Sequence, residues 1–270
     1  MIFGQETNPT VLIGWKINRL RKELGREDLR SAYETDSTIA GTSARLIQGI
    51  TRPVRIIFTS PILALLALYM SFVFGLLYLL FTTITSVFTS TYGWPVDLAG
   101  LAYLGIGAGF VVGISVVAKT SDTTVVRLTQ ANHGVYKPEM RLASCLTFAL
   151  FVPVSFFWYG WSADKQVHWI VPILGLVPFG FGMMGIFAPI QTYFIDVSGP
   201  YAASAVAALT ATRCLFGAFL PLAGPSMYST LGLGWGNSLL GFIALGLTPV
   251  PGLIYRFGAS LRERHPISID

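Results

Sequence analysis

Arg213 is the residue whose type and position point most directly to chemistry. It is the single charged residue between Val197 and Tyr255, in a stretch otherwise apolar enough for a membrane. A guanidinium inside a bilayer is costly and generally faces a cavity or a partner. Because the apolar segments contain no Asp or Glu, its partner must be Gln191, a hydroxyl, a backbone carbonyl, or an anion from outside this chain. A binding or coupling role and a purely structural role both fit this position.

A stripe of small and polar residues follows one side of the first apolar segment. Its members recur at steps of four and three, which places them on one helical face: Ser71, Gly75, Tyr78, Thr82 and Thr85. Such a face either lines a water-accessible cavity or packs on a neighbouring helix through small residues. We therefore predict a substrate cavity lined by Ser71, Tyr78, Thr82, Gln191 and Arg213.

Charged residues stand at both entrances of the polar segment from Lys119 to Arg141. Asp122, Glu139 and Arg141 combine acid and base near two predicted helix ends. Ion pairs between them could form a gate that opens when the helices rock. An ordinary charged loop has the same composition, so the spacing leaves both interpretations open.

The residue types do not favour an enzyme or a metal site. The two cysteines, Cys145 and Cys214, lie in apolar runs and can build neither a disulfide framework nor a metal site. The three histidines lie in loops or at an interface, whereas haem binding needs paired histidines inside the membrane. No trio of nucleophile, base and orienting residue is apparent. The sequence therefore predicts no enzyme, no cofactor and no metal.

The second apolar segment is rich in glycine. A dinucleotide-binding loop needs a strand before it and a helix after it, and neither is predicted here. Gly105, Gly109 and Gly113 recur at steps of four and form a small ridge that lets another helix approach closely. This spacing predicts tight helix packing.

The composition indicates where these elements fold. The chain is 53% hydrophobic and 11% charged, against roughly 25% charged in an average soluble domain. That much apolar surface predicts a bilayer as the solvent, with membrane lipids as the first partners. The net charge of +5 does not indicate a nucleic-acid partner, because half of the 18 Lys and Arg residues precede residue 56.

Uncharged intervals predict an all-α membrane fold with six transmembrane helices, because a helix rises about 1.5 Å per residue across roughly 30 Å of hydrocarbon. Turn-forming residues from Gly224 to Gly236 separate the last two helices. The six helices are predicted at about 57–80, between Asp97 and Lys119, between Arg141 and Asp164, between Lys165 and Asp196, at about 201–223 and at about 235–255.

The basic residues predict the orientation of the chain. Loops on the side of the termini hold 16 of the 18 Lys and Arg residues, so both termini are expected in the cytoplasm. The predicted domains are a cytoplasmic arm (1–55), a six-helix bundle (56–256) and a cytoplasmic tail (257–270). The charged residues of the arm predict a short helix that lies on anionic lipid headgroups or binds a partner.

Short motifs spread over nearly the whole chain carry a family resemblance. They are Glu6-Thr7 with Lys16-x-x-Arg19-Leu20-Arg21-Lys22-Glu23, Arg52-Pro53, Pro61 with Gly75-Leu76-Leu77-Tyr78-Leu79, Lys137-Pro138-Glu139-x-Arg141-Leu142, Tyr159-Gly160-Trp161, Tyr193-x-x-Asp196, Tyr201-Ala202-Ala203-Ser204-Ala205 with Arg213, and Gly234-Trp235-Gly236. Together they resemble the C-terminal six-span half of the fungal drug:proton antiporters of the major facilitator superfamily, which are twelve-span exporters of drugs and polyamines.

The resemblance implies a plasma-membrane exporter of a small organic molecule, coupled to protons, and it supports the gate and the cavity role of Arg213. In such transporters the substrate site lies between two six-span bundles, and the first six spans have no counterpart in this sequence. The chain is therefore expected to need a second copy of itself or a separate N-terminal half. The alternative is a truncated product that does not transport, either a remnant or a regulatory or assembly partner in the membrane. The genomic sequence upstream of Met1 discriminates between the two.

Overall fold

The computed structural model describes residues 9–25 and 42–264. The chain divides into two compact units, Met1–Thr51 and Arg52–Asp270, and each is described by itself. The predicted limits of the membrane bundle, 56–256, stay a prediction.

The described part of the first unit contains α1 (Pro9–Leu24), which is the charged helix expected in the arm. It is followed by Gly25, whose φ of 62° is the left-handed conformation that favours glycine after a helix. Arg19 and Glu23 form an exposed ion pair of 2.8 Å, one helical turn apart. Residues 26–41, which include the last basic residues assigned to this helix, lie outside the described part.

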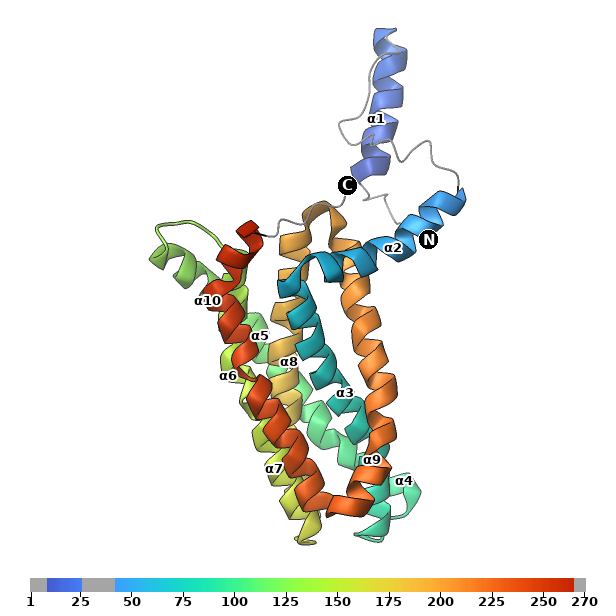
Figure 1. Cartoon of the computed structure of the whole chain (residues 1–270), viewed down its shortest axis with the longest axis vertical. Coiled ribbons are helices and arrows are strands. Elements are labelled where there is room, and N and C mark those ends of the chain that lie inside the picture. Colours follow the sequence, from blue (N-terminus) through green and yellow to red (C-terminus); the bar gives the residue numbers. More distant parts are fainter. Residues whose placement is uncertain (1–8, 26–41, 265–270) are drawn as a thin grey trace. The chain divides into compact units, whose positions relative to one another are not determined.

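The second unit consists of helices joined by short turns, and its long helices lie side by side (Figure 1). The residues that the structure describes contain no β-strand. After α2 (Thr42–Thr59), which begins in the first unit, the elements are α3 (Pro61–Ser90), α4 (Val96–Ala99), η2 (Gly100–Tyr103), α5 (Leu104–Ala131), η3 (Pro138–Ala143), α6 (Cys145–Ala149), α7 (Phe151–Asp164), α8 (Ile170–Ser198), η4 (Gly199–Tyr201), α9 (Ala202–Leu247) and α10 (Pro249–Arg264).

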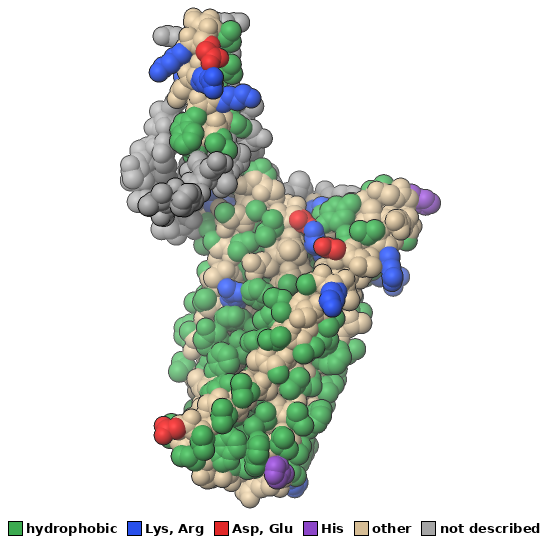
Figure 2. All heavy atoms as spheres, turned by 180° about the vertical axis from the view of Figure 1, so that it is seen from behind, with side chains coloured by type: hydrophobic (Ala, Val, Ile, Leu, Met, Phe, Trp, Pro, Cys, Tyr) green, Lys and Arg blue, Asp and Glu red, His purple; other side chains and the backbone are tan. Residues whose placement is uncertain are grey.

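Four helical stretches within the described ranges are long and apolar enough to cross a membrane, judged by length and composition. The last of them, Ile170–Arg262, is divided into three helical segments at Gly199 and Gly232, where φ is 48° and 74°. One face of the second unit is largely hydrophobic along its length (Figure 2). The all-helical fold class is confirmed, whereas the count of six spans and the cytoplasmic termini stay predictions. The four stretches are Pro61–Ser90, Val96–Ala131, Pro138–Asp164 and Ile170–Arg262.

Two helices run further than the sequence predicts. The predicted loop from Lys119 to Arg141 is wrong over its first half, because α5 continues to Ala131. Hydroxyl side chains there donate to carbonyls one turn earlier, as Thr124 does to Thr120 at 2.8 Å, so the helix itself satisfies its polar side chains. α3 likewise continues to Ser90 instead of stopping near residue 80, and hydroxyls near its end donate to carbonyls of the same helix.

The turn predicted from Gly224 to Gly236 is confined to one residue, Gly232. Gly224 and Pro225 remain inside α9, so this part of the prediction is wrong. Gly224 lies in contact with Thr83 of α3, and a proline inside a membrane bundle is tolerated because its neighbours cover the freed backbone group.

Polar contacts hold the helix reversal at Gly232. The backbone N–H of Gly234 donates to Oδ1 of Asp164, at the end of α7, over 3.2 Å. Asn237 is fully buried, and its Oδ1 accepts a hydrogen bond of 3.0 Å from the hydroxyl of Tyr228. These contacts tie both sides of the reversal to each other and to α7.

We expect Gly232→Ala to lower the thermal stability of the protein. Its φ of 74° and ψ of 175° fall in a region essentially restricted to glycine, where a side chain costs about 1–3 kcal/mol. The melting temperature of the purified complete protein in detergent measures the effect. Gly246→Ala is the matched control, because Gly246 is helical and open to a Cβ. Equal shifts for the two variants would contradict the expected strain.

The glycine ridge of α5 packs directly on α8. A Cβ on Gly105 or Gly109 would collide with the carbonyl oxygen of Ile173 or Val177 in α8. One on Gly113 would lie 3.0 Å from another α8 backbone oxygen, that of Phe181. The close packing predicted from the steps of four is therefore confirmed.

Candidate functional site

Arg213 lies in α9 with its guanidinium over two aromatic rings of neighbouring helices. Its Cζ atom is 4.8 Å from the ring centre of Phe74 in α3 and 5.1 Å from that of Phe187 in α8. Both distances are within the roughly 6 Å reach of a cation–π interaction. The Nε atom is buried and has no hydrogen-bond partner. No carboxylate of the described residues forms an ion pair with this guanidinium.

Small residues let α3 and α9 approach closely beside the arginine. Gly217, one turn beyond Arg213, lies against the ring of Tyr78, so that a Cβ there would be 3.2 Å from the ring. A Cβ on Gly75 would likewise lie only 3.0 Å from Cδ2 of Leu220 in α9. The sequence predicted either packing or a cavity for this side of α3, and Gly75 serves packing.

An aromatic row, Phe74, Tyr78, Phe81 and Tyr103, follows α3 away from the guanidinium. Neighbouring ring centres along the row are 5.1, 6.0 and 5.6 Å apart. Tyr78 and Phe81 are 41% and 40% exposed. The hydroxyl of Tyr103 donates to the carbonyl of Phe81 at 2.7 Å, which fixes the far end of the row. The row is an apolar surface that begins beside the charge.

The other predicted cavity residues lie in three different environments. Ser71 is fully buried in α3, and its hydroxyl has no hydrogen-bond partner. Thr82 is exposed, and its hydroxyl donates to a carbonyl of the preceding turn at 2.9 Å. Gln191 is half-buried and lies one turn beyond Phe187 on the same side of α8. The structure thus places Ser71 within the packed helix and Gln191 on the same side of α8 as Phe187, the ring that contacts Arg213.

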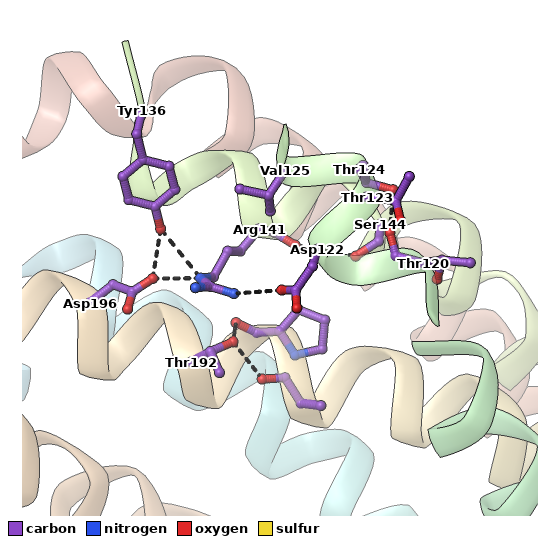
Figure 3. Close-up of polar contacts among 12 residues, drawn as sticks. Thr120, Asp122, Thr123, Thr124, Val125, Tyr136, Arg141, Ser144, Thr192 and Asp196 are labelled. Carbon is purple, nitrogen blue, oxygen red and sulfur yellow. Dashed lines mark hydrogen bonds and ion pairs between the residues drawn. The ribbon is translucent and has the colours of Figure 1, made fainter. Parts of the chain in front are cut away.

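An ion cluster lies where α5, η3 and the end of α8 meet (Figure 3). Arg141 of η3 donates from Nε to Oδ2 of Asp196 in α8. The hydroxyl of Tyr136 donates to the same carboxylate oxygen at 2.7 Å and accepts from Arg141 at 3.3 Å. Asp122 of α5 lies 3.9 Å from Nη1 of Arg141. The fold therefore brings two of the three predicted gate residues together.

Arg141 and Asp196 form the strong pair of this cluster. Their side chains are 23% and 26% exposed, whereas that of Asp122 is 87% exposed. A freely solvated pair contributes about 0–1 kcal/mol, and a hydrogen bond between partly buried charged groups about 1.5–3 kcal/mol. Asp196 also lies in the last turn of α8, where the helix dipole disfavours a carboxylate, and the guanidinium offsets that cost.

Tyr136 remains protonated across the physiological pH range. Partial burial raises the pKa of Tyr136, and its hydrogen bond to Asp196 raises it further, against a smaller opposing effect of Arg141. Its hydroxyl therefore stays a hydrogen-bond donor to Asp196 at any pH at which the carboxylate is ionised.

Glu139, the third predicted gate residue, does not belong to the ion cluster. Its carboxylate lies 3.3 Å from Nε of Arg262 in α10, and its side chain is only 3% exposed. Its Cγ atom lies 3.0 Å from the position of a Cβ on Gly258, so α10 covers it closely. The single gate network expected from sequence is therefore corrected to two separate pairs that both involve η3.

The sequence does not predict three residues that take part in these contacts: Asp196, Tyr136 and Arg262. Asp196 offered a signal, because it is the single charged residue between Lys165 and Arg213. Tyr136 and Arg262 offered none, because their partners are set by the turn before η3 and by the docking of α10, which no local pattern encodes.

The described residues contain no group of three or more His, Cys, Asp or Glu that could hold a metal ion. Cys145 is buried and Cys214 is exposed, and neither forms a disulfide.

Comparison with known proteins identifies membrane transporters as relatives. The model of the Major Facilitator Superfamily matches residues 11–221. Similar proteins are the MFS transporter cpaT of Aspergillus oryzae (46% identical over 98% of this chain), the MFS-type transporter mpsC of Macrophomina phaseolina (48% over 97%) and the MFS-type transporter penM of Penicillium rubens (46% over 96%). No solved structure matches the chain.

The aligned regions cover 53%, 51% and 50% of those three proteins, so the chain spans about half the length of the relatives it matches. The family match extends over more than half of the chain and includes the helices that carry Tyr78, Arg141 and Gln191. From its sequence and its all-helical, apolar fold, this chain belongs to the major facilitator superfamily.

Proposed function

We propose that this chain is one six-helix bundle of an exporter that carries a small organic molecule out across the plasma membrane in exchange for protons. Its family and its fungal relatives support a role in transport. The observation that favours a substrate site is the region around Arg213, where α3, α8 and α9 combine a cation, an exposed aromatic row and Gln191. A small organic substrate needs such a combination of apolar surface and a few polar groups.

A second bundle completes this site. Substrate sites of such transporters lie between two bundles, and the chain covers about half of its relatives. The second bundle belongs either to the same gene product, to a separate polypeptide or to a second copy of this chain. The full-length transcript and the mass of the purified complex distinguish these sources.

Alternating access accounts for the two ion pairs of η3. Arg141–Asp196 joins η3 to the end of α8, and Glu139–Arg262 joins it to α10. We assign these pairs to closing the end of the bundle that the basic residues predict to be cytoplasmic. Because the charged hydrogen bond between Arg141 and Asp196 contributes about 1.5–3 kcal/mol, substrate binding can supply the free energy that separates this pair.

Deleting the gene in its source organism tests export. We expect at least one small organic compound to decrease in the medium and to accumulate in the cells, measured by untargeted mass spectrometry of both fractions. Reintroducing the complete gene should restore the distribution, and the same gene with an early stop codon should not. An unchanged distribution in the deletion strain contradicts the proposal. In the restored strain, an ionophore that collapses the proton gradient should stop efflux.

A further inference from the structure

The guanidinium of Arg213 lacks an acceptor for its hydrogen atoms within the described chain. Phe74 and Phe187 stabilise its positive charge through their rings, at 4.8 and 5.1 Å. Aromatic rings, however, do not replace the in-plane oxygen acceptors that the five N–H groups of arginine need. Nε is buried without a partner, which is costly in a low-dielectric environment. An oxygen ligand would therefore meet the guanidinium at its two Nη atoms, since the buried Nε is closed to it.

The acidic side chains in the described helices do not supply that ligand. Asp196 is bound by Arg141, and Glu139 faces a different arginine, Arg262. Asp164 accepts the backbone N–H of Gly234 at the opposite turn. The missing acceptor must come from a molecule or a segment outside this set.

We propose that Arg213 binds the carboxylate of an amphipathic organic acid, and that this acid is the substrate class of the site. A carboxylate matches the planar fork of a guanidinium and accepts two parallel hydrogen bonds. Gln191, one turn from Phe187 on α8, offers a further amide donor on the same side. The assignment of this acid as the substrate class rests on the proposed transport function. The binding of a carboxylate to Arg213 does not depend on that function.

The apolar part of such an acid would bind along the aromatic row. The row continues from Phe74 to the exposed rings of Tyr78 and Phe81. It runs on the same side of Arg213 as Gly217, which lies against the ring of Tyr78. A molecule with its carboxylate on the guanidinium can lie with its hydrophobic body along these rings. A cationic amine would instead meet an uncompensated positive charge, so the site favours acids over the polyamines that the family resemblance suggests.

Three dansyl probes with the same fluorophore test the binding. They are dansylglycine, which carries a carboxylate, its methyl ester, and dansylcadaverine, which carries an amine. Binding to the purified complete protein in detergent is measured by fluorescence anisotropy. We expect dansylglycine to bind most tightly. Arg213→Gln should weaken it about tenfold or more and change binding of the ester less than about twofold.

Arg127→Gln is the matched charge control, because Arg127 is exposed on α5 and should leave all three affinities unchanged. Arg213→Lys should give an intermediate affinity, since it keeps the charge and loses the fork. If Arg213→Gln does not fold, Phe187→Leu replaces it and should weaken only dansylglycine. Equal affinity for acid and ester, no saturable binding of dansylglycine, or an acid preference that survives Arg213→Gln overturns the proposal.

Proteoliposomes separate this proposal from the transport function. Dansylglycine that binds through Arg213 but does not cross the membrane contradicts export and leaves the binding site intact. Translocation of dansylcadaverine in preference to dansylglycine contradicts the acid site and leaves export intact. Translocation of dansylglycine that is lost in Arg213→Gln supports both.

Discussion

Gly109→Ala should destabilise the protein, whereas the same substitution two residues away, Gly107→Ala, should stabilise it or leave it unchanged. A Cβ at Gly109 would collide with the carbonyl oxygen of Val177 and lie 2.9 Å from Cα of Gly180, and these backbone atoms cannot rotate away. Overpacking of this kind costs about 1–3 kcal/mol, and a contact between two backbones belongs at the upper end. We expect a lower melting temperature and a lower yield of monodisperse protein in detergent.

Gly107 makes this test independent of helix propensity. It lies on the same helix and has nothing within 4 Å of a Cβ position. Alanine is favoured over glycine in a helix interior by about 1 kcal/mol, so propensity alone stabilises both variants. Opposite signs at Gly107 and Gly109 therefore report the packing of α5 on α8. Stabilisation at both positions would show that the two helices are further apart than described.

Asp196→Asn should reduce export about tenfold or more while the protein still accumulates in the membrane. The substitution removes the anion that Arg141 and Tyr136 share at the end of α8. Losing a charged hydrogen bond of about 1.5–3 kcal/mol changes the balance between closed and open states by a factor of ten or more. The measurement is efflux of the compound found in the deletion experiment, normalised to the amount of the protein in the membrane fraction.

Asp122→Asn is the control for this prediction, because its carboxylate is 3.9 Å from Arg141 and almost fully solvated. It should change efflux less than about twofold, as expected for an exposed pair. Exchanging the charges, with Asp at position 141 and Arg at position 196, should restore part of the activity. Normal efflux by Asp196→Asn would refute the gate role of the pair.

Repetition along the chain predicted the helix packing well. Gly105, Gly109 and Gly113 identify a contact ridge because three small side chains on one face leave only backbone for the neighbour to meet. The position of Arg213 in an uncharged stretch likewise marked it as exceptional. Its two ring partners come from α3 and α8, far apart in the sequence, so only the fold could reveal them.

Helix ends and pairings were less predictable. Charge placement suggested that α5 stops near Lys119, but α5 continues to Ala131, and threonine hydroxyls in this part donate to carbonyls of their own helix. That extension places Asp122 on a helix instead of a loop. It also shortens the connection to η3, where Arg141 pairs with Asp196 of α8 and Glu139 with Arg262 of α10. These pairings depend on which helices meet at η3, so the residue types alone do not predict them.

The buried ion pair of Glu139 has a consequence for the order in which the chain is built. Its partner, Arg262, leaves the ribosome long after η3 has been inserted. The docking of α10 therefore covers the carboxylate of Glu139 and supplies its cation in the same step. A last helix that docked without Arg262 would bury this carboxylate unpaired, which is strongly destabilising, so the final helix must carry its arginine for the bundle to close.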